Sequence, residues 1–364
     1  MNKNLILGLD IGGANTKAAF LQYKNGLIIE GSSYIEYFPF WVKTLNDIPQ
    51  MLERVTKKLS DISKIKDLKN SLSSVAVTIT AELSDAFQTK KEGILTILNA
   101  LEQVFPSEKL YFISITSQFL SLKRARKNYE KIAAANWVST ALFVGHFISD
   151  CILIDAGSTT IDIIPILRGK PVAKGYNDVT RMVNHELIYT GGLRATIPSI
   201  THFIPYRGKK VRISFEKFAL VSDVHRILNN ISEKEYTNDT ADNRGKSVDE
   251  CYARLAKIIC MDLNMISRDE LDHIAKYVYE KQKDIIKREY NLFFEDLISR
   301  HSQFSKNTPI IITGLSANFL VQPCLEELGF EKIHEYEKVV DIPDQVGSSA
   351  FAVAGALLKQ SDEI

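Results

Sequence analysis

Two short segments of this chain share one design, and that repetition restricts the folds it can adopt. Residues 152–164 (ILIDAGSTTIDII) place an apolar run before Asp155, then a Gly-Ser-Thr-Thr turn and a second apolar run. Residues 5–20 (LILGLDIGGANTKAAF) repeat this pattern around Asp10, with a glycine-rich turn followed by Lys17. Apolar runs on both sides of a glycine turn predict a β-hairpin. One copy in each half of the chain predicts a duplicated architecture.

The polar turns of the two predicted hairpins are suited to an anion. Backbone N–H groups and hydroxyls in such turns attract anionic oxygens, and neighbouring carboxylates can hold a cation beside the anion. The candidate phosphate-contacting residues of the turns are Gly12, Gly13, Asn15, Thr16, Gly157, Ser158 and Thr159. For either hairpin alone, a glycine that serves only turn geometry is an equally good interpretation. The repetition favours one anion between the two halves.

Composition narrows the class of protein. A chain of 364 residues is long enough for two domains with full cores. A net charge of +1 gives no sign of a nucleic-acid-binding surface. Asp10 interrupts any signal-peptide core, and no apolar run approaches the ~20 residues of a membrane span. The four cysteines show no CxxC pairing, so buried, reduced thiols are expected. We therefore expect a cytoplasmic protein with small-molecule substrates and neither nucleic-acid nor membrane partners; homo-oligomerisation is left open.

The hydrophobic pattern predicts strands and helices in alternation. Apolar residues three or four positions apart between residues 45 and 62 indicate an amphipathic helix. The β-branched run at 74–80 (SVAVTIT) predicts a buried strand. The second half restarts with its own hairpin and a predicted third strand at 172–176. A late strand at 309–313 and a helix at 347–358 complete this half.

Residues 10–17 and 155–162 resemble the two phosphate motifs of the actin, sugar-kinase and Hsp70 superfamily. Residues 310–317 (IIITGLSA) are similar to its late strand-glycine segment, where Gly314 would allow close approach of the backbone to a phosphate-bearing ligand. The resemblance implies an α/β fold with two actin-like (ribonuclease-H-like) lobes flanking a cleft and an insertion in the second lobe. The implied boundaries are 1–150 for the first lobe, 151–190 with 265–364 for the second, and 191–264 for an inserted substrate or lid region.

Within this superfamily the chain is similar to the hydantoinase A/oxoprolinase-like branch. More narrowly, it resembles the methanofuran-biosynthesis synthases, also described as tetrahydromethanopterin-linked one-carbon pathway proteins. The segments that carry this resemblance are 77–85 (VTITAELSD), 134–137 (AANW), 185–194 (HELIYTGGLR) and 236–246 (YTNDTADNRGK). They are more specific than the hairpins, because the fold does not require them. Ala81 departs from the pattern, in which a glycine is expected.

This resemblance implies a transferase. It would condense an (aminomethyl)furan-methyl diphosphate with the phenol oxygen of γ-glutamyltyramine and release diphosphate. Such a site must stabilise the departing diphosphate, for which Mg²⁺, hairpin amides and a lysine are suited. A neutral phenol, with a pKa of about 10, also needs a base. ATP could occupy the cleft, but the resemblance implies that none is consumed.

The implied catalytic residues lie in and beyond the hairpins. Asp10 and Asp155 are the candidate Mg²⁺ ligands, and Asp162 is a third unless its side chain faces solvent from its strand. Lys17 is the candidate contact to a phosphate oxygen. The candidates for the base are Glu82, His185 and Glu186. The His-Glu pair does not extend to HExxH, so zinc-dependent hydrolysis is unsupported.

A polar segment at 222–249 is either a solvated loop or a lid over substrate. The candidate substrate-binding residues are Arg194, Asp239, Asp242, Arg244 and Lys246. Among them, Arg194 could pair with the γ-glutamyl carboxylate. Other functions stay open at this point. A small-molecule kinase or an ATPase-like switch would use the same hairpins, and an amidohydrolase of the hydantoinase kind is a further alternative.

Overall fold

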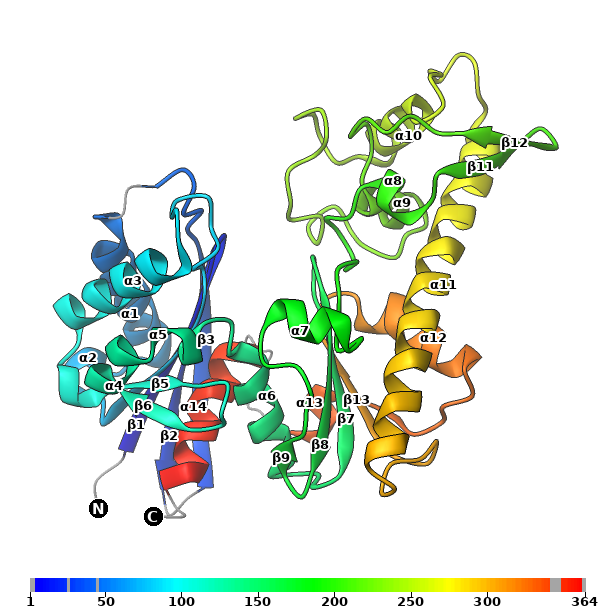
Figure 1. The fold of residues 1–364 in the computed structure, drawn as a ribbon. Helices are drawn as coiled ribbons and strands as arrows, with labels where there is room; N and C mark the ends of the chain where they lie inside the picture. Colours follow the sequence, from blue (N-terminus) through cyan, green and yellow to red (C-terminus); the bar gives the residue numbers. More distant parts are fainter. Residues whose placement is uncertain (1–3, 25–26, 44–45, 341–347, 362–364) are drawn as a thin grey trace. The chain divides into compact units, whose positions relative to one another are not determined.

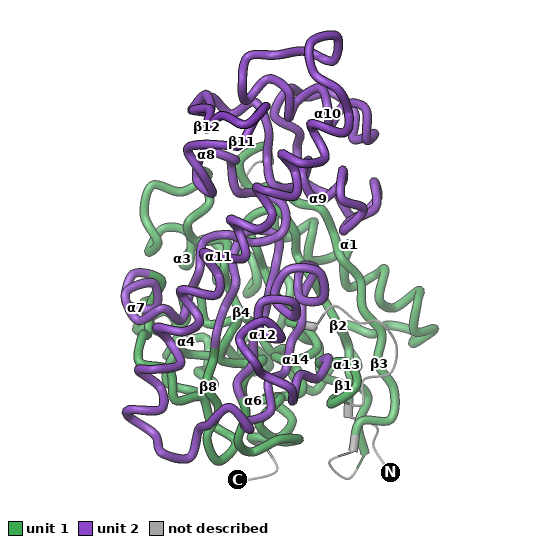
Figure 2. Tube along the Cα trace, turned by 90° about the vertical axis from the view of Figure 1, so that its right-hand side faces the viewer, with its two compact units in different colours: residues 1–151, 164–178, 336–364 green, residues 152–163, 179–335 purple. Residues whose placement is uncertain are grey.

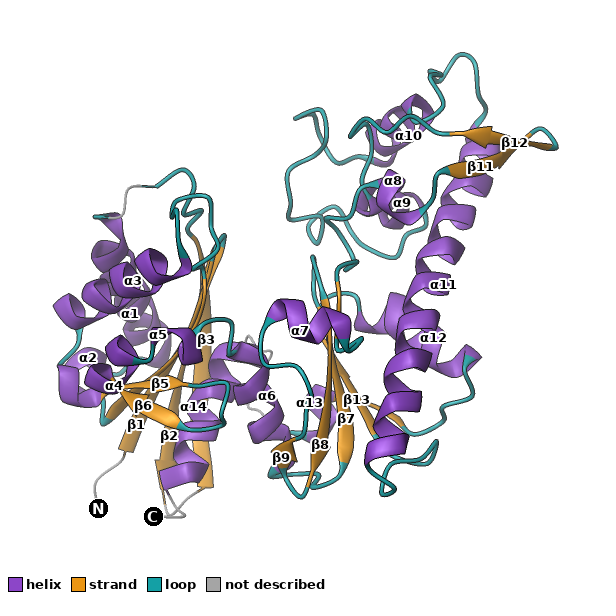
Figure 3. Cartoon of the chain, in the orientation of Figure 1, coloured by secondary structure: helices purple, strands orange, loops and turns teal. Residues whose placement is uncertain are grey.

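The computed structural model describes residues 4–24, 27–43, 46–340 and 348–361. The chain divides into two compact units, drawn in different colours in Figure 2. Unit 1 comprises Met1–Cys151, Ile164–Asp178 and Tyr336–Ile364, and unit 2 comprises Ile152–Ile163 and Val179–Glu335. Both units contain helices and strands (Figure 3), so the α/β class is confirmed. None of the helices within the described ranges combines the length and apolarity needed to cross a bilayer.

The elements follow the chain as shown in Figure 1. The strands are β1 (Asn4–Gly12), β2 (Asn15–Lys24), β3 (Leu27–Tyr37), β4 (Ser74–Thr80), β5 (Leu110–Ile113), β6 (Phe119–Ser121), β7 (Cys151–Ala156), β8 (Ile161–Leu167), β9 (Lys170–Pro171), β10 (Leu187–Ile188), β11 (Phe203–Tyr206), β12 (Lys209–Arg212), β13 (Ile310–Thr313) and β14 (Ile333–Glu335). The α-helices are α1 (Asp47–Ser63), α2 (Leu68–Ser71), α3 (Lys90–Val104), α4 (Leu122–Lys127), α5 (Tyr129–Ile132), α6 (Asn136–Gly145), α7 (Asp178–Val183), α8 (Ile197–Ile200), α9 (Val221–Ile227), α10 (Val248–Lys257), α11 (Arg268–Arg300), α12 (Gln322–Glu327), α13 (Tyr336–Val339) and α14 (Ser348–Ser361). A 3₁₀ turn, η1 (Ser107–Lys109), and a π-helical turn, η2 (Ala317–Val321), complete them.

The sheet of unit 1 has the strand order β3-β2-β1-β4-β5-β6. The first three strands are antiparallel, whereas β4 is parallel to both β1 and β5. The strand predicted at 74–80 is confirmed as β4. The third strand of the antiparallel part is β3, which pairs with β2.

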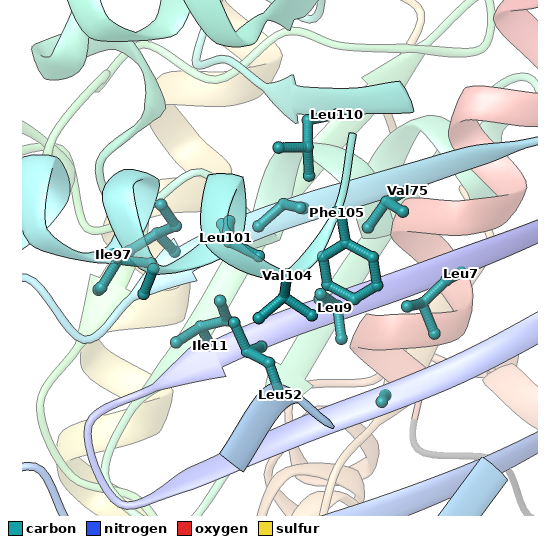
Figure 4. Packing of buried hydrophobic residues seen from close by; sticks show 14 of the residues in the cluster. Leu7, Leu9, Ile11, Leu52, Val75, Ile97, Leu101, Val104, Phe105 and Leu110 are labelled. Atoms are coloured by element: carbon teal, nitrogen blue, oxygen red, sulfur yellow. The ribbon is translucent and has the colours of Figure 1, made fainter. Parts of the chain in front are cut away.

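Alternation along β1 sends its side chains to two faces of this sheet. Leu7, Leu9 and Ile11 join the hydrophobic cluster formed with α1 and α3 (Figure 4). Gly8 lies between them in sequence and faces α14; a Cβ there would sit 1.9 Å from the Ala350 carbonyl oxygen. The missing side chain therefore lets α14 pack directly on β1. Asp10, two residues further along, faces the same side, at the start of α14.

Two details of the predicted core differ from the structure. The amphipathic helix is confirmed as α1, with Ile48, Leu52, Val55 and Leu59 buried. Ile62, however, is 49% exposed, because it lies in the last turn of α1 beyond its final buried residue. Leu45 falls outside the described residues. All four cysteines are free; Cys151, Cys251 and Cys324 are buried as expected, but Cys260 is exposed.

The second sheet repeats the first in its strand order, β10-β8-β7-β13-β14. Here β7, β13 and β14 are parallel, and β10 pairs antiparallel with β8. Both sheets thus show the ribonuclease-H-like order, and the fold-class prediction is confirmed. The third strand predicted at 172–176 is wrong. Val172 only extends the short β8–β9 hairpin by bonding to Pro165, and the chain returns to the sheet later, as β10.

The observed units differ from the expected boundaries at two places. Residues 336–364 belong to unit 1, because α14 packs on β1, β2, β4 and α6. Residues 164–178 also belong to unit 1, where Gly169 lies directly against Gly145 at the end of α6. The two compact units do not correspond to the three expected regions. The domain boundaries 1–150, 151–190 with 265–364, and 191–264 stay predictions.

The inserted region has a hydrophobic cluster of its own within unit 2. It joins residues of α8, β11, α9 and α10 to the first turns of α11, and Figure 1 shows these elements beside that end of α11. The polar segment at 222–249 is not a solvated loop throughout. Asp223, His225 and Tyr236 have 0% exposure, since α9 and the following loop form part of this cluster.

Candidate active site

Asp10 and Lys17 lie opposite each other on β1 and β2, near the carboxyl end of β1. Oδ2 of Asp10 accepts a hydrogen bond from Ser349 Oγ at 2.5 Å and lies 3.7 Å from Lys17 Nζ. Lys17 Nζ also donates to Ser349 Oγ at 3.2 Å. The structure therefore brings these two predicted residues into one polar cluster, with Ser349 of α14 as a third member.

Polar atoms around Asp10 are buried without a hydrogen-bond partner in the described part of the chain. They are Oδ1 of Asp10 and the hydroxyl of Thr78, its neighbour on β4. The hydroxyl of Thr16 is also buried without a partner there, but Thr16 pairs with Ile11 and therefore faces the other side of the sheet. Leaving such groups unsatisfied costs about 1–3 kcal/mol each. The groups of Asp10 and Thr78 lie side by side near the carboxyl end of β1, which fits a place where a metal ion, water or substrate supplies the missing bonds.

Glu82 follows β4, whose last residue, Thr80, pairs with Gly12 of the first hairpin. Its side chain is buried, and Oε2 has no hydrogen-bond partner among the described residues. Burial raises the pKa of Glu82 to about 7. A carboxyl group with this pKa can accept a proton near neutral pH. The neighbouring Ala81 has no positive φ, so the departure from the expected glycine introduces no backbone strain.

The two hairpin turns direct their peptide bonds in the same way. The carbonyl oxygens of Gly13 and Ala14 accept bonds from the amides of Phe40 and Phe38 at 3.0 and 2.9 Å. Because N–H and C=O point in opposite directions across a trans peptide, the amides of Ala14 and Asn15 point away from that segment. The first turn thus presents backbone donors on one side.

The second turn is held by the segment after β10. The carbonyls of Gly157, Ser158 and Thr159 accept bonds from the backbone amides of residues 191–194, at 2.9 to 3.1 Å. The same geometry then directs the amides of Ser158, Thr159 and Thr160 to the opposite side. The predicted phosphate-contacting turns therefore both have the donor arrangement that an anion needs.

Asp155 is the penultimate residue of β7 and lies beside the late glycine segment. Gly314 has a φ of +95°, and a Cβ there would lie 2.7 Å from Asp155 Oδ1 and 2.5 Å from the Ala156 carbonyl. Only glycine fits this position. Thr313, the register partner of Asp155, has a buried hydroxyl without a partner in the described residues. Gly314 thus has a packing role at the second hairpin.

Asp162 has a charged partner that the sequence did not indicate. Its Oδ1 accepts a hydrogen bond from Nη1 of Arg181 at 2.5 Å, and the Arg181 side chain is only 2% exposed. Arg181 also donates to the carbonyl oxygen of Glu186 at 3.0 Å. An aspartate that neutralises a buried arginine is poorly placed to share its charge with a metal. The pair with Arg181 favours a structural role for Asp162, and metal ligation by Asp162 stays a prediction.

The other two candidate bases are engaged in unit 2. His185 has a φ of +59°, and its Nδ1 lies 2.7 Å from Oε2 of Glu289 on α11. Glu186 is completely buried, and its backbone bonds both Ile163 and Arg181. Among the three candidates, Glu82 has the most suitable setting for a base.

The expected substrate residues lie in the inserted region with different surroundings. Arg194 is exposed, while its amide holds Ser158. Asp242 forms an ion pair with the buried Arg254 at 3.0 Å, and Lys246 lies 5.3 Å from the ring centre of Tyr236. Asp239 and Arg244 are exposed. The ion pair between Asp242 and Arg254 thus fixes this loop to the core of the inserted region, while the side chains of Asp239 and Arg244 stay exposed.

Residues that sequence reasoning missed explain much of this geometry. They are Thr78, Ser84, Arg181, His225, Gln282 and Ser349. Thr78 and Ser84 lie within the singled-out segment 77–85, which was the available signal. Ser349 is 339 positions from Asp10, and no local pattern connects them. Within the described ranges, no group of three or more His, Cys, Asp or Glu residues is placed to hold a metal ion.

The chain is similar to known proteins in sequence and in fold. A family model described as hydantoinase/oxoprolinase matches residues 73–361. A curated protein of Methanocaldococcus jannaschii, named (4-{4-[2-(gamma-L-glutamylamino)ethyl]phenoxymethyl}furan-2-yl)methanamine synthase, is 37% identical over 363 residues, covering 99% of this chain and 100% of its own length. A protein of the same name from Methanococcus vannielii is 34% identical over 198 residues, covering 54% of this chain and 83% of its own.

Among solved structures, a nucleotide-free acetone carboxylase has a similar fold. The match covers 97% of this chain and 70% of that chain, with a TM-score of 0.54 and 12% identity. Such a likeness concerns the fold alone. The family model and the end-to-end relative carry more, and the chain belongs to the hydantoinase/oxoprolinase family, in its branch of methanofuran-biosynthesis synthases.

Proposed function

We propose that this chain is the synthase that forms the aryl ether bond of (4-{4-[2-(gamma-L-glutamylamino)ethyl]phenoxymethyl}furan-2-yl)methanamine. The observation that carries this proposal is the relative of that name, which aligns end to end at 37% identity. The name describes a phenoxymethyl group on a furan. The new bond therefore joins a phenol oxygen, from γ-glutamyltyramine, to the methylene carbon of an (aminomethyl)furan-methyl diphosphate.

The reaction is a substitution at carbon. The bond between that methylene carbon and the diphosphate oxygen breaks, and diphosphate leaves with the electron pair. The phenol oxygen forms the new carbon–oxygen bond and loses its proton. Because the furan ring stabilises positive charge at this carbon, the enzyme must chiefly stabilise the leaving group and accept the proton.

The hairpins are suited to the leaving group. Each turn offers backbone donors of the kind that bind phosphate oxygens, and Lys17 supplies a positive charge at the first hairpin. Mg²⁺ typically takes one or two protein carboxylates and completes its shell with phosphates and water. The buried, unpartnered Oδ1 of Asp10 fits that role, and Asp155 is the equivalent carboxylate of the second hairpin. When bound, Mg²⁺ would offset the negative charge that develops on diphosphate.

Glu82 is the base in this proposal. The phenol has an ordinary pKa of about 10, so a carboxylate that takes its proton during bond formation assists the attack. The pKa of about 7 leaves Glu82 substantially ionised at neutral pH, and its burial keeps water from competing. His185 is less suited, because its Nδ1 is engaged by Glu289.

The inserted region binds the acceptor. Arg194 pairs with the γ-glutamyl carboxylate, and the loop that carries Asp239, Asp242, Arg244 and Lys246 contacts the polar end of the substrate. The amide of Arg194 is fixed to the second turn, while its side chain is exposed. This connection would set the acceptor next to the diphosphate.

The decisive experiment incubates the purified protein with both substrates and Mg²⁺. Mass spectrometry should detect the ether, with one diphosphate released for each product molecule and no ATP consumed. γ-Glutamylphenethylamine, which lacks the phenol hydroxyl, is the matched control and should release no diphosphate. Conversion of ATP to ADP with a phosphorylated small molecule would instead establish a kinase, and acceptor-independent ATP hydrolysis would establish a switch.

An amidohydrolase is the second candidate function, because the matching family model is described as hydantoinase/oxoprolinase. An amidohydrolase would open a cyclic imide or lactam and would need no diphosphate substrate. Hydrolysis of hydantoin or oxoproline, with and without ATP, separates this alternative from the synthase.

A further inference from the structure

A chain of buried hydrogen bonds links the inserted region to the segment after β10. His225 on α9 and Gln282 on α11 both have 0% exposure. Nε2 of His225 lies 3.0 Å from Oε1 of Gln282, and Nδ1 lies 3.1 Å from Nδ2 of Asn230. Nε2 of Gln282 is 3.0 Å from both the Thr190 hydroxyl and the Gly191 carbonyl oxygen. The proposed reaction uses none of these groups.

The Gly191 carbonyl oxygen determines which group is the donor in each of these hydrogen bonds. The Gly191 carbonyl can only accept, so Gln282 must present its NH₂ there and its oxygen to His225. His225 then donates from Nε2–H and accepts at Nδ1 from the amide group of Asn230. This is a neutral imidazole, consistent with burial, which lowers the pKa of His225 to about 4. Every member of the chain thus has one defined hydrogen-bonding role.

At its Gly191 end, this series of hydrogen bonds reaches the second hairpin turn. The amide of Gly191 donates to the Thr159 carbonyl at 2.9 Å, and Gly192 donates to Gly157 at 3.0 Å. By holding the carbonyl groups of the turn, these bonds also fix the direction of the N–H groups on the other side of the same peptides. Those N–H groups are the proposed anion donors. A displacement of the Gly191 peptide would therefore reorient the donors of the turn.

The two glycines leave this segment few other means of being positioned. A Cβ on Gly191 would lie 2.6 Å from the Gly157 oxygen, and one on Gly192 would lie 2.7 Å from Cβ of Ser316. Neither residue has a side chain to anchor, so at these two positions peptide groups hold the segment, and the side chain of Leu193 packs in the hydrophobic cluster just beyond them. Phe319 of η2 forms the facing wall. Its ring lies 4.7 Å from His225 and would touch a Cβ on Gly192 at 3.1 Å.

We propose that Gln282 and His225 are positioning residues that set the second hairpin turn for diphosphate through the Gly191 peptide. The diphosphate affinity of the turn thereby depends on the folded state of the inserted region, since His225 belongs to α9 in its core. The ligand identity rests on the proposed function. The mechanical link between His225 and the turn does not.

The test measures three quantities on the full chain: the dissociation constant of inorganic diphosphate with Mg²⁺ by calorimetry, amide hydrogen exchange of residues 191–194, and the free energy of unfolding. Gln282→Leu and His225→Leu should weaken diphosphate binding about tenfold and accelerate exchange at residues 191–194. His225→Gln keeps a donor for Gln282 and should recover most of both properties. In the active enzyme, KM for the diphosphate substrate should rise more than kcat falls.

Tyr252→Phe is the matched control. It removes the 2.6 Å hydrogen bond to Asp272 on α11 from the hydroxyl of Tyr252, which belongs to the same hydrophobic cluster. It leaves the hydrogen bonds of His225, Gln282 and Gly191 intact. It should alter unfolding without changing exchange at 191–194. If Gln282→Leu and His225→Leu lower stability while exchange there changes no more than in this control, the inference is wrong. If the wild-type protein binds no diphosphate, the proposed function fails, and the exchange measurement still decides the positioning role.

Discussion

The two hairpins carry similar sequences but differ in how their charges are used. In the first, Asp10 and the residue seven positions later, Lys17, share one cluster with Ser349, and Oδ1 of Asp10 has no partner among the described residues. In the second, the residue seven positions after Asp155 is Asp162, which is paired with the buried Arg181. The turns are alike in presenting backbone N–H groups on one side, while the charged side chains differ.

This difference indicates a division of work between two related structures. A duplicated backbone supplies the same anion-binding turn twice, because the turn depends on glycine and on peptide directions. The charged side chains are free to diverge. Near the first hairpin, buried groups without a partner among the described residues include those of Asp10, Thr78 and Glu82. We therefore expect the chemistry to depend most on unit 1, and the second hairpin to depend more on its support.

The largest loss of turnover is expected when Asp10 or Asp155, the equivalent carboxylates of the two hairpins, is replaced. Asp162 should differ from both. Asp10→Asn and Asp155→Asn should each lower kcat by about a hundredfold or more, because each removes a negative charge from the proposed Mg²⁺ site. Steady-state kinetics at saturating Mg²⁺ measures the loss, and circular dichroism should show an intact fold. Turnover that persists in EDTA, or in both variants, would show that diphosphate leaves without a cation held by the protein.

The next effect concerns Glu82, the titratable group on the first hairpin's side. As a base it must be ionised, so kcat/KM should rise with pH and level off above about 7. Glu82→Gln should lower kcat by about a hundredfold and remove this rising limb. A Gln variant with an unchanged pH profile would transfer the role to another group, and His185→Gln is the matched comparison.

Stability provides an independent check on the environment of Glu82. Its folded-state pKa of about 7 lies above the ordinary 4.5, so folding favours the protonated form. This contribution is fully present below about pH 4.5 and is lost as pH rises through 7, at up to about 1.4 kcal/mol per pH unit. Urea unfolding between pH 5 and 7.5 should show a steeper decline in the wild type than in Glu82→Gln. Equal slopes would mean that the Glu82 carboxyl is solvated.

Particular residues show where sequence was informative. Apolar runs around Asp10 and Asp155 predicted both hairpins, because alternation and glycine turns are local signals. The third strand of unit 2 was misplaced, because the real one, β10, has two residues and no pattern of its own. The partners of Asp10 and Asp162 were invisible, since Ser349 and Arg181 reach them through tertiary packing. Glu82 was named from its segment, but only burial supplies its raised pKa.

A smaller loss of turnover is expected in the inserted region. Arg194→Ala and Lys246→Ala should raise KM for γ-glutamyltyramine, or lower kcat, by about tenfold without abolishing binding of inorganic diphosphate. Both side chains would contact the acceptor, beyond the groups that stabilise the leaving group. Tyramine without its γ-glutamyl group serves as the test substrate, and Arg194→Ala should affect it less. Equal losses on both acceptors would remove the proposed pairing of Arg194 with the carboxylate.

The smallest effect on turnover is expected at Asp162, although its effect on stability is large. Asp162→Asn removes a carboxylate that pairs with the buried Arg181, and breaking this buried pair should lower the free energy of unfolding by about 3 kcal/mol. At temperatures where the variant is folded, kcat should stay within about threefold of the wild type, because Asp162 is not a metal ligand in this proposal. The double variant Asp162→Asn/Arg181→Met is the sharper comparison. It removes both charges, so it should recover much of the lost stability and unfold at higher denaturant than the single variant. Should Asp162→Asn instead abolish turnover in a fully stable protein, the two hairpins would be alike in function as well as in backbone, and the contrast between Lys17 and Asp162 would lose its meaning.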